Sequence, residues 1–161
     1  MGIRNVLVFK YKGQEIEMRW FKNGVPEDIY PEILIMVREL FTKLTIHQMK
    51  SFLEHVEIAK EIWGCFYDEK GNEIQTRDYE NIYDFQGNYL GEKSLPPPPI
   101  IFNLQKLDRQ NIAEMFNADY ILLGGIPGDD YLYFVDFDEE TVDCCEKDRT
   151  ILKTTKFDQL N

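Results

Sequence analysis

The sequence has few of the residues and patterns that mark the common catalytic and metal-binding sites. Its only cysteines are Cys65, Cys144 and Cys145, without a Cys-x-x-Cys pair or a disulfide-framework spacing. The two histidines, His47 and His55, are eight residues apart, whereas a helical zinc pair needs a spacing of four. Phosphate-loop, dinucleotide-binding and hydrolase nucleophile motifs are all missing. We therefore expect no catalytic residue, no metal site and no cofactor.

Long apolar runs are missing too. The N-terminal stretch MGIRNVLVFKYKG has no signal-peptide core, and no run approaches the roughly 20 apolar residues that a spanning helix needs. Three thiols without a pairing pattern fit a reducing compartment. We expect a cytoplasmic protein that does not bind membranes.

Basic residues are scarce relative to acidic ones, 18 against 29, which gives a net charge of −11. The imbalance lies in the second part of the chain: residues 1–60 balance to +1 and residues 61–161 to −12. Between Asp129 and Asp148 there are nine acids and one lysine, Lys147. Such a field repels nucleic acids and anionic membranes and attracts basic proteins and cations. The charge could also serve only for solubility.

Length and composition fit one domain spanning residues 1–161, because 43% hydrophobic residues are enough for a core. Strands are predicted at 6–11 and 15–21, the second from the alternation of apolar and charged side chains, and together they predict a hairpin. Helical spacing then predicts two consecutive helices, about 29–44 and 46–63. The second helix begins after a capping-box pattern at Thr45-x-x-Gln48.

The pattern Y-D-x-x-G-N occurs twice, at 67–72 and 83–88. Asp closes a turn through its side chain, and Gly and Asn tolerate positive φ, so each copy predicts the tip of a β-hairpin. Pro96–Pro99 follows as a stiff connector, which would mark a sub-boundary if the domain has two parts. The alternative, a polyproline ligand for an aromatic-lined groove, stays open.

The C-terminal part predicts a strand at 100–107 and a short helix from Asp108 to Phe116. Two further strands, 120–123 and 131–137, flank a Pro-Gly-Asp-Asp turn and predict a second hairpin in or near the core. The order of elements indicates an α+β fold. We expect a mostly antiparallel or mixed sheet built from hairpins, with the two consecutive helices and the short third helix packed on it.

The string ILLGGIPGDDYLYFVDFDEETV, residues 121–142, resembles the C-terminal segment of SUKH-type domains, a group that includes bacterial toxin-immunity proteins. In that segment an apolar strand, a glycine-containing turn and an acidic strand follow one another. The hairpin expected at the N-terminus departs from the helical start of that family. The resemblance implies an immunity-type function for the acidic segment but is not taken as family membership.

These observations favour a small acidic binding protein whose acidic face docks on a basic protein. Its most concrete version is an inhibitor or immunity-type protein that masks a nuclease toxin or another nucleic-acid-binding protein, with carboxylates that mimic phosphates. Nucleic acid itself is not an expected partner. The predicted partner-binding residues are Asp129, Asp130, Tyr131, Tyr133, Asp136, Asp138, Glu139, Glu140, Asp143 and Glu146.

Two alternatives belong to other classes. One is a carboxylate-based enzyme, with or without a divalent ion bound by such residues as Asp136 and Asp138. The segment that starts at Asp136 begins like a calcium loop, but Thr141 and Lys147 replace the glycine and glutamate that the loop requires. The other alternative is a structural or assembly component. The sequence does not indicate an oligomeric state.

Overall fold

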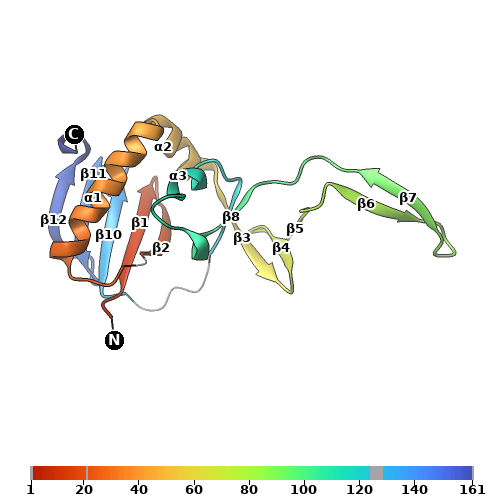
Figure 1. Cartoon of the computed structure of the whole chain (residues 1–161), viewed down its shortest axis with the longest axis horizontal. Helices are drawn as coiled ribbons and strands as arrows, with labels where there is room; N and C mark the ends of the chain where they lie inside the picture. Colours follow the sequence, from red (N-terminus) through yellow and green to blue (C-terminus); the bar gives the residue numbers. More distant parts are fainter. Residues whose placement is uncertain (1, 21, 124–128, 161) are drawn as a thin grey trace.

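The computed structural model describes residues 2–20, 22–123 and 129–160. It confirms the predicted α+β class: helices and mixed sheets form a compact body from which a long two-stranded arm projects (Figure 1). No helix among the described residues is long and apolar enough to cross a membrane.

The main sheet has five strands in the order β12-β11-β10-β1-β2. Its strands are β1 (Asn5–Tyr11), β2 (Gln14–Trp20), β10 (Tyr131–Asp136), β11 (Thr141–Glu146) and β12 (Ile151–Lys156). β1 and β10 are parallel, and the other neighbours are antiparallel. The predicted N-terminal hairpin is therefore confirmed. Ile16, Met18 and Trp20 of β2 face the core, as the alternation along this strand requires.

Helix α1 (Pro26–Lys43) covers one face of the main sheet (Figure 1). Its apolar residues recur at helical spacing, and Ile33 and Val37 are completely buried. The Tyr30 hydroxyl donates a hydrogen bond of 2.7 Å to the Val142 carbonyl oxygen, so the helix is also tied to β11.

Helix α2 (Ile46–His55) begins as predicted but is much shorter than the expected helix 46–63. Thr45 and Gln48 form the capping box, and the helix ends at His55, with Val56 as the C-cap. The next residues form strand β3 (Glu57–Ile62), which pairs in parallel with β9 (Tyr120–Leu122). Hydrogen bonding to a distant strand thus overrides the helical spacing of this segment.

A smaller sheet lies beside the body, in the order β5-β4-β3-β9-β8. Its remaining strands are β4 (Cys65–Tyr67), β5 (Glu73–Ile74) and β8 (Ile101–Asn103). The hairpin predicted from the runs 120–123 and 131–137 is wrong, because β9 pairs with β3 and β8 while β10 pairs with β1 and β11. Part of the turn predicted between them, residues 124–128, lies outside the described residues.

The segment after β8 is less regular than predicted. A short 3-10 helix, η1 (Leu104–Lys106), replaces the second half of the expected strand 100–107. Asp108 does not begin the helix, because its carboxylate closes a turn by accepting the N–H groups of Gln110 and Asn111. Helix α3 therefore covers only Ile112–Met115. A last 3-10 helix, η2, spans Phe157–Gln159.

The two Y-D-x-x-G-N copies form the predicted turns with the same hydrogen bonds. In each, one Asp carboxylate oxygen accepts the N–H of the second and fourth following residues, at 2.8–2.9 Å. Gly71 and Gly87 both have a φ of +85°, which a side chain would strain. The first copy joins β4 to β5, and the second joins β6 (Tyr79–Tyr83) to β7 (Tyr89–Ser94).

The arm consists of β6, β7 and the turn between them, residues 79–94. β6 and β7 form a sheet of their own, and Pro96–Pro99 leads from β7 back to β8 in the body. The arm extends away from the body over its whole length (Figure 1). Its side chains are therefore open to solvent on both faces.

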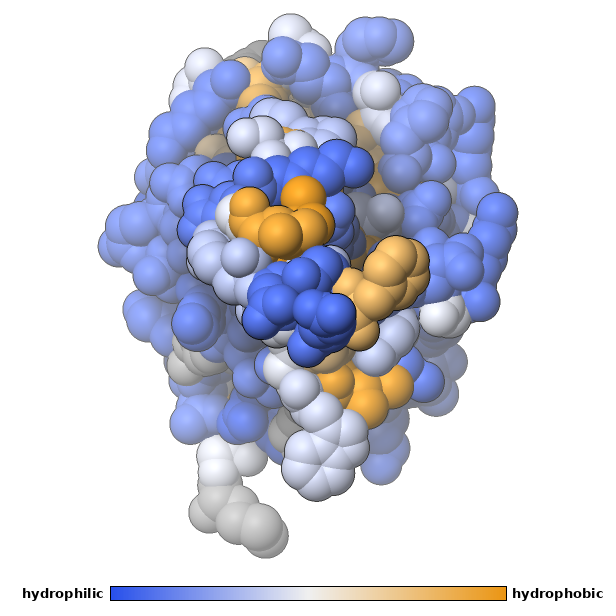
Figure 2. Space-filling view, turned by 90° about the vertical axis from the view of Figure 1, so that its right-hand side faces the viewer, coloured by the Kyte–Doolittle hydropathy of each residue, from blue (hydrophilic) through white to orange (hydrophobic). Residues whose placement is uncertain are grey.

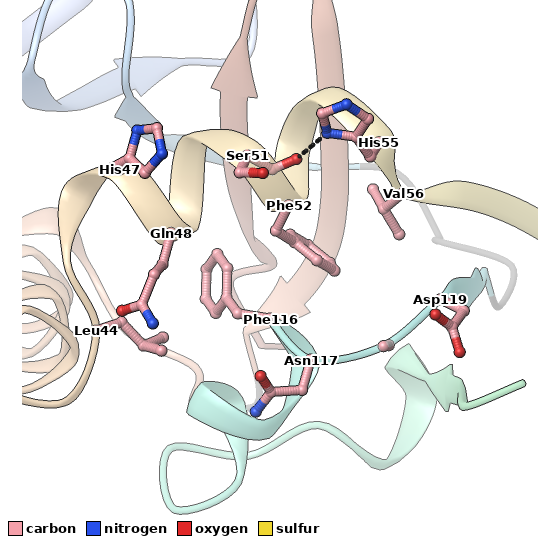
Figure 3. A pocket seen from close by; sticks show the side chains of 11 residues that line it. Leu44, His47, Gln48, Ser51, Phe52, His55, Val56, Phe116, Asn117 and Asp119 are labelled. Atoms are coloured by element: carbon pink, nitrogen blue, oxygen red, sulfur yellow. Dashed lines mark hydrogen bonds between the residues drawn. The ribbon is translucent and has the colours of Figure 1, made fainter.

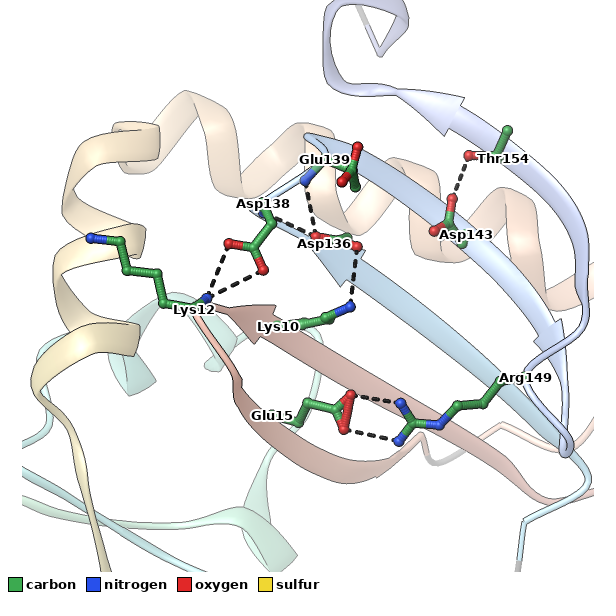
Figure 4. A network of polar contacts seen from close by, with 9 residues as sticks. All are labelled: Lys10, Lys12, Glu15, Asp136, Asp138, Glu139, Asp143, Arg149 and Thr154. Carbon is green, nitrogen blue, oxygen red and sulfur yellow. Dashed lines mark hydrogen bonds and ion pairs between the residues drawn. The ribbon is translucent and has the colours of Figure 1, made fainter.

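A second apolar cluster lies on the face of the main sheet opposite α1. It contains Val6, Val8, Leu132, Phe134 and Cys145. Arg149 reaches across this face, with its guanidinium 5.2 Å from the centre of the Phe134 ring. Its two terminal nitrogens contact the Glu15 carboxylate at 2.8 and 2.9 Å (Figure 4). Charged side chains thus shield the cluster from water.

Candidate functional site

The ten residues predicted to bind a partner lie on β10, β11 and the segments at their ends, but they do not form one face. β10 is about 17 Å long at roughly 3.4 Å per residue. One group lies at its C-terminal end and comprises Asp136, Asp138, Glu139 and Glu140. A second group lies at its N-terminal end and comprises Asp129, Asp130, Tyr131 and Glu146. The strand length separates the two groups.

Three of the ten residues are buried, which corrects their assignment to a contact surface. Tyr133 is 0% exposed, Asp136 6% and Asp143 9%. Tyr133 lies on the α1 side of the sheet, where burial raises its pKa well above the ordinary value for tyrosine. Asp143 accepts a hydrogen bond from the Thr154 hydroxyl. Sequence alternation indicates two faces for a strand, but it does not show that both faces are covered.

Asp136 holds the β10–β11 turn (Figure 4). One carboxylate oxygen accepts the N–H groups of Asp138 and Glu139, at 2.9 and 3.1 Å. The other oxygen lies 3.8 Å from Lys10 Nζ. The role of this carboxylate is therefore structural.

We predict that Asp136→Ala lowers the free energy of unfolding by about 1–3 kcal/mol, because two N–H groups and Lys10 lose their acceptor. Urea denaturation at neutral pH would measure the change. Glu139→Ala, an exposed position in the same turn, is the control and should stay within about 0.5 kcal/mol of the parent protein. An Asp136→Ala protein as stable as the control would contradict the assigned role.

Two of the exposed acids of the same turn contact neighbouring segments. Asp138 accepts the backbone N–H of Lys12, at 3.1 and 3.2 Å to its two oxygens. Glu140 lies 3.5 Å from Lys50 Nζ. Lys10 and Lys50 thus offset part of the negative charge at this end of the sheet, whereas the Lys12 side chain contacts Glu54.

The other end of β10 contains a hollow with an acidic lining. This pocket of about 470 Å³ is lined by Ile3, Asp130, Tyr131, Glu146, Lys147 and Asp148, and we call it the acidic hollow. Three predicted residues, Asp130, Tyr131 and Glu146, meet here. Asp148 was missed, although it ends the same acidic run in the sequence.

Two of the carboxylates in the acidic hollow are held by hydrogen bonds from backbone N–H groups. Asp130 accepts the Arg4 backbone N–H at 2.7 Å and lies 3.7 Å from Arg4 Nε. Asp148 accepts the Thr150 N–H at 3.0 Å, and this bond lowers the pKa of its carboxyl group. Carboxylates in the same hollow as the Tyr131 ring suit a lysine or arginine side chain, through charge-assisted hydrogen bonds and cation–π contact.

A second pocket, of about 430 Å³, lies between α2 and the segment after α3 (Figure 3). His47 and His55 stand at its two ends, about 12 Å apart along the helix, so they cannot share one metal ion. His55 Nδ1 lies 2.8 Å from the Ser51 carbonyl oxygen and donates to it. Asp119, on the opposite wall, already accepts the Ile100 N–H at 2.8 Å. These polar groups serve local structure.

The cysteines do not offer an activated nucleophile in β11. Cys144 and Cys145 are buried there, and burial raises the pKa of both thiols, that of Cys145 to about 11. Within the described ranges, no group of three or more His, Cys, Asp or Glu side chains is arranged to hold a metal ion.

The arm is an exposed surface that the sequence did not predict. The turn motif predicted its tip, but nothing in the motif shows that the hairpin is uncovered. Phe85 at the tip is completely exposed, and the Tyr83 and Tyr89 rings lie 5.8 Å apart between their centres. Figure 2, which looks along the arm toward the body, shows hydrophobic residues at the surface among hydrophilic ones.

Comparison with known proteins returned no match: no protein-family model, curated protein sequence or solved structure was found to be similar to this chain. The function must therefore be argued from the geometry of the chain.

Proposed function

We propose that this chain is a cytoplasmic binding protein that docks on a basic protein through the acidic hollow. In its most concrete form, it is an inhibitor or immunity-type protein that masks a nuclease toxin or another nucleic-acid-binding partner. The observation that carries the proposal is the concave arrangement of Asp130, Glu146 and Asp148 around Tyr131.

The hollow gathers three carboxylates and contains one lysine, Lys147, and Arg4 contacts Asp130. At the β10–β11 turn, by contrast, Asp136 is buried and Glu140 faces Lys50. A partner arginine or lysine that contacts phosphate in a nucleic-acid complex would contact carboxylates in the hollow. The two ligands would then compete for the same cationic group. The net charge of −11 would speed the encounter by steering.

The test uses an oligo-arginine peptide as a defined basic probe. In the triple variant Asp130→Asn, Glu146→Gln and Asp148→Asn, each amide keeps an oxygen that can accept the local hydrogen bonds. The matched control, Glu61→Gln, Glu73→Gln and Glu92→Gln, removes the same charge from exposed sites on β3, β5 and β7.

We expect the hollow variant to bind the probe at least about 10-fold more slowly at low salt, and the control to change much less. Stopped-flow fluorescence would measure the rates, and binding should weaken as salt rises. The parent protein should also displace the probe from labelled DNA. Equal losses in both variants would show that only net charge matters and would remove the hollow from the proposal.

A further inference from the structure

The arm exposes several large apolar side chains on a free two-stranded hairpin. Its exposed apolar side chains are Tyr79 (43%), Ile82 (38%), Tyr83 (57%), Phe85 (111%), Tyr89 (57%) and Leu90 (64%). An isolated two-stranded hairpin is only marginally stable in water, and three or more strands with an apolar face are needed for independent stability. Additional strands would therefore stabilise the arm.

The outer edge of β6 can accept another strand. The Asp78 carbonyl oxygen accepts the Leu95 N–H at 2.8 Å. The N–H and C=O groups of every second residue, namely Asp78, Glu80 and Ile82, therefore face β7. The N–H and C=O groups of Tyr79, Asn81 and Tyr83 then point outward. β7 is the poorer edge, because an extra residue interrupts its pairing and Gly91 has a φ of +126°.

We propose that two copies of this chain associate through their arms. β6 of one copy pairs antiparallel with β6 of the other around a two-fold axis at Asn81. The product is a four-stranded sheet in the order β7-β6-β6-β7, in which the outward peptide groups of both β6 strands become paired.

The β6 sequence is complementary to itself in this register. Tyr79 faces Tyr83 of the second copy, Glu80 faces Ile82, and Asn81 faces Asn81, so aromatic side chains pair and no like charges meet along the strand. A register shifted by two residues in one direction would place Glu80 opposite Glu80 of the second copy. If two β7 strands paired around a two-fold axis instead, the residue on the axis would lie opposite its own copy. That residue would be the charged Glu92 or Lys93, or the flexible Gly91.

The two-fold axis also collects the tyrosines on one face of the new sheet. Tyr83 and Tyr89 are cross-strand partners, and Tyr79 lies on the same face as Tyr83 because the two are four residues apart. Each copy therefore contributes three tyrosines to a common surface. The combined face is thus twice as rich in tyrosine as the face of a separate hairpin.

Charge does not prevent this association, because the antiparallel arrangement places the two acidic bodies at opposite ends of the paired arms. The overlap of about 14 Å exceeds the Debye length of roughly 8 Å at physiological salt. Past the strand ends, Asp84 lies opposite Asp78 of the second copy. Salt should therefore strengthen self-association, whereas it should weaken binding of a basic probe to the acidic hollow.

The first test is sedimentation velocity of the full chain from roughly 1 µM to 1 mM. We expect a reversible monomer–dimer equilibrium. Asn81→Pro removes an outward N–H without removing a hydrogen bond to β7, and should weaken the dimer at least 10-fold. Glu92→Pro is the matched control, because Glu92 lies directly opposite Asn81 and faces the other edge of the arm. It should leave dimerisation intact.

The second test checks the register with cysteines in a Cys65→Ser background. In the proposed sheet the two Asn81 Cα atoms are about 5.5 Å apart, within disulfide range. Asn81→Cys should therefore form a covalent dimer on mild oxidation, and Glu92→Cys should form it at least 10-fold more slowly.

A protein that stays monomeric over the whole concentration range would overturn the proposal and leave the arm free for a different protein. It would also be overturned by a dimer that Asn81→Pro and Glu92→Pro weaken equally, or by equal cross-linking of the two cysteine variants. None of these outcomes bears on the acidic hollow, whose test uses different residues.

Discussion

Replacing Phe9 by alanine is expected to lower the free energy of unfolding by about 3–5 kcal/mol. Phe9 is 0% exposed and lies where three parts of the fold meet. Its ring is in edge contact with Phe116 at 5.4 Å and stacks on Phe137 at 6.3 Å between ring centres. The substitution would thus leave a cavity between β1, the segment after α3 and the β10–β11 turn.

Domains are typically stable by only about 5–15 kcal/mol, so this loss would leave the protein close to unfolding. Urea denaturation followed by circular dichroism would measure the shift in midpoint. Phe85→Ala is the control, because it removes the same ring from a fully exposed site and should change stability by less than about 0.5 kcal/mol. Similar midpoints for the two variants would contradict the packing described for Phe9.

The second large effect concerns the thiols. Iodoacetamide at pH 8 should modify Cys65, which is only partly buried, at least about 1,000-fold faster than Cys144 and Cys145. Those two thiols are 0% and 2% exposed and react only when the chain opens, which for a stable domain is a population of about one in a thousand or less. Mass spectrometry of peptides after timed quenching would give the three rates.

Concentrated urea is the control, since all three thiols should then react at similar rates. Rapid labelling of Cys144 or Cys145 in the native protein would show that β11 is accessible, against the buried sheet described above. The reactivity of Cys145 is reduced further because the pKa of its thiol is raised to about 11. Burial is the largest cause, and the nearby Asp143 adds to it.

The raised pKa also predicts how stability depends on pH. The unfolded Cys145 thiol has a pKa of about 8.5, so the unfolded chain loses this proton at a lower pH than the folded chain does. The contribution of this thiol to the free energy of unfolding is therefore fully present below about pH 8.5, and it is lost as the pH rises toward 11.

The features predicted correctly from sequence depend on residues that are close together in the chain. The alternation in β2, the capping box of Thr45 and Gln48 and both Asp-closed turns are present in the structure. Their physical causes are local, because side-chain periodicity and hydrogen bonds between neighbouring residues act within one segment. The α+β class follows from such local preferences taken together.

The errors occur where a distant segment decides the outcome. Residues 57–62 have helical spacing but form a strand, because β9 pairs with residues 57–59 and β4 pairs with residues 60–62. β9 and β10 are both strands, as their apolar runs indicate, but they belong to different sheets. The apolar pattern predicts that a strand forms, but does not identify its partner.

The candidate site shows the same division. Its net negative charge and half of its lining residues could be taken from the sequence, since charge is a property of composition. The tertiary structure alone buries Tyr133, Asp136 and Asp143, and it gathers Asp130, Glu146 and Asp148 in one hollow. It places Lys50 beside Glu140. It also leaves the arm uncovered. Burial and convergence depend on contacts between residues far apart in the chain, and these contacts arise only when the whole chain packs.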